Sequence, residues 1–129
     1  MRLTGKCKVD FEKWYVDYKN WIEYTVNEDG ETDIYKIDIK EFYEHKDSMQ
    51  YGVYVDFFDS IGIMIELQVH VNPTMQGGSF KCIRPAILSD GRFHNVGASF
   101  RKRDRARTAA IEKANEIYDS GELLLKQFD

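Results

Sequence analysis

The stretch IMIELQVHVN, residues 63–72, determines the fold class that this sequence predicts. Aliphatic and β-branched residues occupy every second position, which is the pattern of a strand with one buried and one solvent-facing side. The residues expected on the buried side are Ile63, Ile65, Leu67, Val69 and Val71. The segment NPTMQGG, residues 72–78, then predicts a turn, so the chain should fold back into a second strand.

Two further strands complete a predicted antiparallel meander. They are SFKCIRPAIL, residues 79–88, and RFHNVGASF, residues 92–100, and the Asp90-Gly91 pair between them favours a two-residue type I′ turn. Pro85 has no N–H group, which predicts a bulge or pairing on only one side at that position. The residues expected to share one face of the third strand are Val96, Ala98 and Phe100.

Helices are predicted before and after this meander. Asp47 or Ser48 can cap a helix that ends at Gly62, and its expected packing stripe is Met49, Val53, Phe57 and Ile61, flanked by Tyr54 and Phe58. A last helix should begin with Asp104 as its cap and end at Gly121, with a thin packing face made of Ala106, Ala109, Ala110, Ala114, Ile117 and Tyr118. The sequence therefore predicts an α+β fold, in which an αβββα unit has a three-stranded antiparallel sheet covered by helices.

The chain is expected to form a single domain, residues 1–129, with this αβββα unit at residues 47–121. Residues 1–46 precede the unit as an N-terminal helical extension. Thr4 can cap an additional helix over residues 4–24, whose apolar stripe is Cys7, Phe11, Trp14, Tyr15, Tyr18 and Ile22. Residues 34–43 fit a short strand or a helical turn equally well, and the sequence leaves both open.

Composition excludes several classes of protein. Apolar residues make up 43% of the 129 residues and aromatic residues 14%, which is too many for a disordered tail. No apolar run reaches the ~18 residues of a membrane span, and the N-terminus lacks an apolar leader, so we expect a cytoplasmic protein without membrane contact. Two cysteines are too few for a disulfide framework or a zinc site, and we expect both in the core, Cys82 facing inward beside Phe80.

Charge is distributed unevenly along the chain. Residues 10–66 contain 15 acidic and 5 basic residues, a net of −10, whereas residues 79–107 contain 8 basic and 2 acidic residues, a net of +6. These two regions either neutralise each other or present a basic surface to an anionic partner.

The basic residues concentrate in one cluster at the expected start of the last helix. We call Arg101, Lys102, Arg103, Arg105 and Arg107 the basic cluster. Arg105 and Arg107 should occupy the first helical turn, where cations oppose the helix dipole and where an anion is favoured. The basic cluster therefore predicts a phosphate-binding surface more readily than a purely structural helix start.

Part of the sequence resembles short uncharacterised proteins encoded by phages and prophages of gut bacteria. The stretches that carry the resemblance are KVDFEKW, SMQYGVYVDFFDSIGI and ARTAAIEKANEIY, at residues 8–14, 48–63 and 106–118. The resemblance covers about a third of the chain and implies a phage-borne origin without a defined activity.

The predicted helix–strand–strand–strand–helix order is similar to that of the double-stranded-RNA-binding domain. That family carries a Lys-Lys-x-Ala-Lys stretch at the start of its last helix, with basic side chains that straddle phosphates. Arg103, Ala106 and Arg107 match this pattern, whereas Asp104 stands at its second basic position. The turn at residues 72–78 lacks the family's Gly-Pro-x-His element, and the helix before the sheet carries Asp56 and Asp59, which would repel phosphate.

Other chemistry has little support in the sequence. His70 and His94 should lie on the outer sheet face with Glu66 and Gln68, but two strand spacings separate them, which is too far for one metal ion. We expect no enzyme activity, no cofactor and no metal. The sequence predicts a small non-enzymatic binding module that contacts RNA or DNA backbone through the basic cluster. The alternative is an acidic inhibitor or adaptor that binds a host protein; the oligomeric state is left open.

Overall fold

The computed structural model describes residues 1–26 and 38–121. These residues form helices α1 (Gly5–Val26), α2 (Lys40–Glu44) and α3 (Asp47–Ser60), strands β1 (Met64–Pro73), β2 (Ser79–Ser89) and β3 (Arg92–Asn95), and helix α4 (Arg103–Ser120). The predicted α+β class and the helix–strand–strand–strand–helix order from α3 to α4 are confirmed. Residues 40–43 lie in α2 and are helical, whereas residues 34–37 lie outside the described residues.

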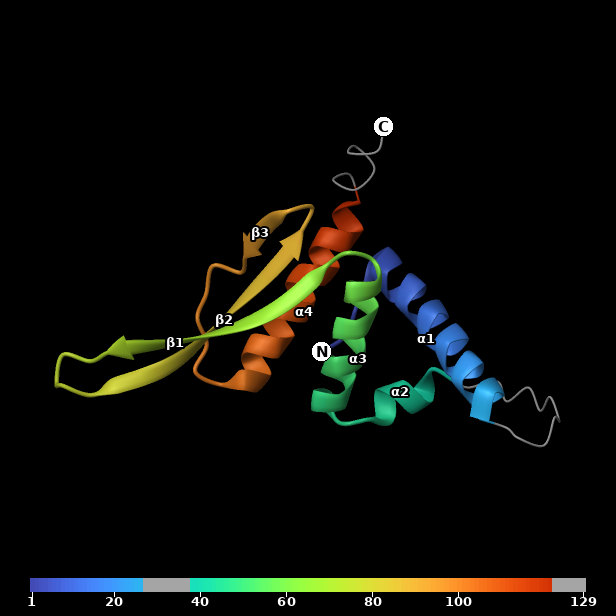
Figure 1. The fold of residues 1–129 in the computed structure, drawn as a ribbon, viewed down its shortest axis with the longest axis horizontal. Coiled ribbons are helices and arrows are strands. Elements are labelled where there is room, and N and C mark those ends of the chain that lie inside the picture. Colours follow the sequence, from blue (N-terminus) through green and yellow to red (C-terminus); the bar gives the residue numbers. More distant parts are fainter. Residues whose placement is uncertain (27–37, 122–129) are drawn as a thin grey trace.

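The three strands form one antiparallel sheet in the order β1-β2-β3. The hairpin between β2 and β3 is the predicted two-residue turn, because Asp90 and Gly91 have φ angles of 56° and 72° and Ser89 pairs with Arg92. Helices α3 and α4 cover one face of the sheet (Figure 1). The side chains of β1 alternate between this apolar, helix-covered face and the opposite, polar face. This alternation is the reason why the sequence pattern predicted β1 correctly.

Pro85 explains where β3 ends. It lies opposite Leu67 in a continuous β1–β2 register, so the structure shows the one-sided pairing and no bulge. Ile83 bonds through both its N–H and its C=O to Phe100 on the β3 side, and alternation directs the position of Pro85 to that side too. Since Pro85 has no N–H to donate there, pairing stops at Asn95 and resumes only at Phe100. The expectation of one continuous third strand over residues 92–100 was therefore wrong.

The predicted buried side of β1 holds only for its first half. Ile63 is completely buried and Leu67 is half-buried, but 52% of Val69 and 61% of Val71 are exposed. The reason is the length of the β1–β2 hairpin, whose distal half extends beyond the helices that cover the rest of the sheet (Figure 1). We call this distal part, residues 69–81, the hairpin arm.

The predicted packing stripe of α3 is correct at Phe57 and at Val53 and Ile61, which pack against the core, but wrong at Met49. Met49 is 55% exposed, and the buried residues of α3 are Gln50, Tyr54, Phe57 and Phe58. Gln50 can be buried because its side-chain amide donates a 2.8 Å hydrogen bond to the carbonyl of His45. The predicted stops are correct, since Gly62 and Gly121 both have left-handed φ angles.

Neither acidic residue proposed as a helix cap acts as one. The N-cap of α3 is Lys46, with Asp47 inside the first turn, and the N-cap of α4 is Lys102, with Asp104 inside the first turn. No side chain hydrogen-bonds as a cap at either end. Both aspartates still complement the positive end of the helix dipole from within the first turn.

Helix α1 shares the hydrophobic core with the rest of the fold. Phe11 is completely buried, and its ring lies 4.9 Å from that of Phe42 and 4.8 Å from that of Tyr54. The start of α1 is also tied to α4, because the Asp119 carboxylate accepts a 2.8 Å hydrogen bond from the Cys7 N–H. Among the described residues, no helix has the length and apolarity required to cross a membrane.

Candidate nucleic-acid interface

The basic cluster lies where the chain leaves the sheet and enters α4. Arg101 follows the Phe100 bridge to β2, and its guanidinium lies 5.0 Å from the centre of the Phe80 ring in the hairpin arm. Lys102 is the N-cap of α4, and Arg103 and Arg105 lie in its first turn. All four side chains are exposed to solvent. The cluster therefore joins the hairpin arm to the start of α4.

Arg107 differs from the other four cations. It is half-buried, and its guanidinium lies 5.3 Å from the centre of the Tyr51 ring on α3. Its Nε is shielded from solvent and has no hydrogen-bond partner. Burial raises the pKa of Tyr51, and the positive charges of Arg107 and Arg103 oppose that rise. Arg107 thus helps to hold α4 against α3, and four cations form the exposed part of the cluster.

None of the cluster cations forms an ion pair within the described part of the chain. The ion pair found there joins Lys113 to Glu116, at 3.6 Å on α4. We call residues 10–66 the acidic region. Salt bridges between it and the basic cluster would have shown mutual neutralisation, and the described residues contain none. Residues 101–107 carry five cations and one carboxylate, so a net charge of +4 is left without direct compensation.

The first turn of α4 also has uncapped backbone groups. An α-helix leaves its first N–H groups without intrahelical partners, and no side chain caps them here. Exposed cations and free N–H groups therefore occupy the same helix end, which suits phosphate oxygens.

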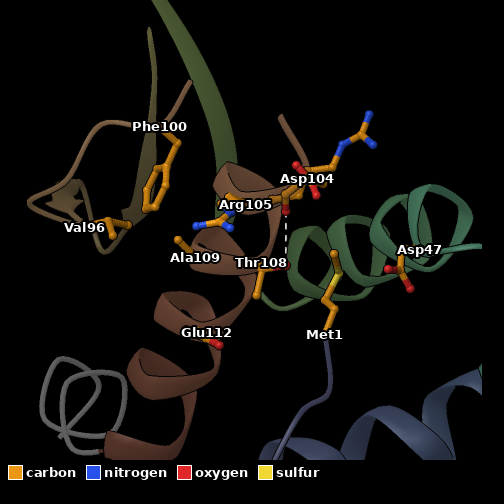
Figure 2. Close-up of a pocket in the computed structure, with 10 residues that line it drawn as sticks. Met1, Asp47, Val96, Phe100, Asp104, Arg105, Thr108, Ala109 and Glu112 are labelled. Carbon is orange, nitrogen blue, oxygen red and sulfur yellow. Dashed lines mark hydrogen bonds between the residues drawn. The ribbon is translucent and has the colours of Figure 1, made fainter. Parts of the chain in front are cut away.

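A hollow of about 560 Å³ opens beside this helix end (Figure 2). Phe100 and Arg105 lie on one side of it, and Met1 and Asp47 lie on the other. Its complete lining is Met1, Asp47, Val96, Phe100, Asp104, Arg105, Arg107, Thr108, Ala109 and Glu112. Three carboxylates outnumber two guanidinium groups there, so the hollow itself does not suit a free anion. The exposed cations between Arg101 and Arg105 lie outside the hollow or at its rim, and they are the groups that suit phosphate.

The acidic region provides a second charged surface. Its described carboxylates between residues 28 and 59 are all exposed, and they are Asp38, Glu41, Glu44, Asp47, Asp56 and Asp59. They lie on or beside α2 and α3. Asp56 and Asp59 belong to the end of α3 that lies away from the start of α4 (Figure 1).

The histidines and cysteines do not form a metal site. No three His, Cys, Asp or Glu side chains of the described ranges gather as metal ligands would. His94 pairs with Ile87, so it lies on the helix-covered side of the sheet, whereas His70 pairs with Cys82 on the outer side. The expectation that both histidines share the outer face was therefore wrong.

The predictions for the two cysteines had different outcomes. Cys7 is in the core, as expected. Cys82 is buried, but it lies on the outer side of the sheet, where its Sγ is 2.8 Å from the Asn72 side-chain amide. The inward orientation predicted for Cys82 was wrong because the β2 register places Ile83, and not Cys82, on the helix-covered side.

Sequence reasoning missed the two ring contacts that position Arg101 and Arg107. Phe80 and Tyr51 are 21 and 56 residues away along the chain from these arginines, and no local spacing predicts such pairs. Comparisons with protein-family models, curated proteins and solved structures find no match to this chain. The functional argument therefore rests on the residues themselves.

Proposed function

We propose that this protein is a non-enzymatic binding module that contacts the backbone of nucleic acid through the basic cluster. The observation that carries the proposal is the exposure of Arg101, Lys102, Arg103 and Arg105 without an ion-pair partner among the described residues. Lys and Arg side chains that neutralise phosphates supply most of the sequence-independent affinity of such proteins.

The position of the cations supports this function over a purely structural one. Arg103 and Arg105 lie in the first turn of α4, where a cation opposes the helix dipole by a few tenths of a kcal/mol. A contact to phosphate would reverse that effect, because the helix end and the side chains would then act on the same anion.

The order of elements supports a related proposal about the ligand and the source. In the double-stranded-RNA-binding domain, which has this order, the start of the last helix contacts phosphates, and the ligand class we propose is RNA or DNA backbone without sequence preference. From the resemblance to phage proteins we also propose a phage-encoded protein that acts in the host cytoplasm.

Charge reversal at the helix start tests the proposal. The unmodified protein should shift both duplex and single-stranded nucleic acid in a mobility-shift assay at ~50 mM salt, where backbone contacts are strong. Arg103→Glu with Arg105→Glu should abolish the shift. Neutral versions of the same two changes should lower the salt slope by about two units, one for each lost phosphate contact.

The matched control is Lys8→Glu with Lys13→Glu, which makes the same charge change at exposed positions of α1. The control should retain binding. The cluster variant should be as stable as the unmodified protein or slightly more stable, because carboxylates suit a helix N-terminus. Absence of any shift by the unmodified protein would refute nucleic-acid binding.

The acidic region favours one alternative, an inhibitor or adaptor that binds a basic surface of a host protein. Its six described carboxylates between residues 28 and 59 are exposed, and none of them forms an ion pair within the described residues. Complementary charge of this kind steers association between proteins. Recovery of a host protein that persists after nuclease treatment, together with no mobility shift, would favour this alternative.

A further inference from the structure

Strand β1 is an edge of the sheet with unused backbone groups. It pairs with β2 on one side, and no other strand of the described chain pairs with it. Ile83 of β2 bonds to Phe100, away from β1, and the direction of the backbone groups alternates along a strand. The even-numbered residues of β2 therefore bond to β1, where their partners include Gln68, His70 and Asn72. The N–H and C=O groups of Leu67, Val69 and Val71 therefore point to the open edge.

The central part of this edge, residues 67–72, lacks the features that usually prevent strand-to-strand association, whereas Glu66 and Pro73 lie at its two ends. Natural edge strands carry charged side chains, proline or bulges. Residues 67–72 contain no Asp, Glu, Lys, Arg or proline, and the register with β2 is unbroken. Val69 and Val71 are also largely exposed, because they lie in the hairpin arm, beyond the helices that cover the rest of their side of the sheet. Within residues 1–26 and 38–121, neither the backbone groups nor the apolar side chains of this segment have a partner strand.

We propose that a second copy of this chain pairs with this edge, strand β1 against strand β1, around a two-fold axis at Val69. In this antiparallel register Val69 faces the partner's Val69, and Leu67 faces the partner's Val71. The outward-pointing backbone groups of these residues then bond across the axis, as the hydrogen-bonded pairs of an antiparallel sheet do. The two three-stranded sheets become one continuous sheet.

The sequence of the edge is complementary to itself in this register. Apolar side chains meet apolar side chains on the side that carries Val69. On the other side Gln68 faces the partner's His70, so no like charges are opposed. A two-fold axis uses the same patch on both copies, which is the commonest symmetry of soluble oligomers. A second copy therefore fits both faces of the exposed segment.

This interface is separate from the proposed nucleic-acid contact, because β2 lies between the open edge of β1 and the chain at Phe100 that leads into the basic cluster. Each proposal can fail alone. The pairing accounts for a feature that nucleic-acid binding leaves unexplained, namely an apolar, uncharged edge on a strongly charged protein.

Mass measurements in solution test the pairing. The full chain has a mass of 15.2 kDa, and sedimentation equilibrium should show twice that mass at ~300 µM, a concentration well above a micromolar dissociation constant. Val69→Lys places two cations opposite each other and should raise the dissociation constant at least about tenfold. The control Met75→Lys changes a fully exposed apolar residue at the tip of the hairpin and should leave the dimer intact.

A crosslinking experiment tests the register and does not depend on the Val69→Lys variant. Residues opposite each other in a hydrogen-bonded pair have Cα atoms about 5.5 Å apart, within reach of a disulfide. Val69→Cys should form a disulfide-linked dimer with oxidised glutathione. Val71→Cys should not, because the two copies of residue 71 would lie about 13 Å apart along the paired strands.

Three results would overturn the proposal. The first is a monomer at every concentration, which would leave the edge to a strand from a different protein or to solvent. The second is a dimer that survives Val69→Lys. The third is a disulfide at residue 71 in place of residue 69. Far-UV circular dichroism of each variant would establish that the fold is retained.

Discussion

The side chain of Cys7 has its acidity set by its surroundings. It is completely buried on α1, and the burial raises its pKa to about 12, with the negative charges of Asp119 and Asp10 adding to the effect. The ordinary pKa of a cysteine is 9.0, so the folded protein keeps the thiol protonated over a pH range in which the unfolded chain loses the proton. Cys7 is therefore an inert core residue and not a nucleophile.

This raised pKa predicts a loss of stability in alkali. Below the unfolded pKa both states hold the proton and the contribution to stability is fully present. Above it the unfolded state alone ionises, so the free energy of unfolding falls by about 1.4 kcal/mol per pH unit for this group. Urea denaturation between pH 8 and pH 11 should show that fall, and Cys7→Ala should make it shallower. An equal slope in both proteins would contradict the assignment.

At the scale of single elements, the alternating pattern predicted the strand but not its surroundings. The pattern from Ile63 to Val71 fixes which side chains share a face, because that depends only on the strand period. Whether a helix covers that face depends on where α3 and α4 end in space. The sequence contains no local signal for that, which is why Val69 and Val71 were predicted as core residues.

The same limit applies to the candidate site. The basic cluster and its place at the start of α4 could be predicted from composition and helix signals. The half-buried position of Arg107 could not be predicted, because it depends on the ring of Tyr51, a residue of another helix. The caps were also misplaced, since a residue with good capping chemistry one or two positions inside the helix gives almost the same sequence signal.

Two substitutions on the alternating run should have very different effects on stability. Ile63→Ala removes a completely buried side chain and should lower the free energy of unfolding by about 2–5 kcal/mol. Val71→Ala, in the same pattern but largely exposed, should change it by less than ~0.5 kcal/mol. Chemical denaturation of dilute, monomeric protein checks both values. Similar losses at the two positions would mean that the hairpin arm is covered after all.

At the scale of the whole molecule, one core connects the N-terminal helix to the rest. Leu3, Cys7, Phe11 and Tyr15 belong to the same buried cluster as Tyr54 and Phe58 of α3 and Ile111 of α4. Asn115 and Asp119 of α4 add hydrogen bonds to the backbone at Thr4 and Cys7. The described helices and the sheet should therefore unfold as one unit.

Tryptophan fluorescence can test this unity, because both tryptophans of the chain, Trp14 and Trp21, belong to α1. Their fluorescence should change at the same denaturant concentration as the far-UV circular dichroism of the whole protein. Phe11→Ala should lower both midpoints together, at a cost of about 3–5 kcal/mol. An earlier fluorescence transition would show that α1 separates before the sheet unfolds.

The interruption of β3 opposite Pro85 has a consequence for the side chains that follow it. Ala86 pairs with Asn95, and Ile83 pairs with Phe100. The chain after β3 therefore takes five steps between these two pairs where β2 takes three, an excess of two residues. Because two is an even number, the chain resumes with its original parity. Phe100 returns on the side of Ile83, and Arg101 returns on the side of Phe80. An excess of one residue would have exchanged them, turning the aromatic ring to water and the guanidinium toward the helices.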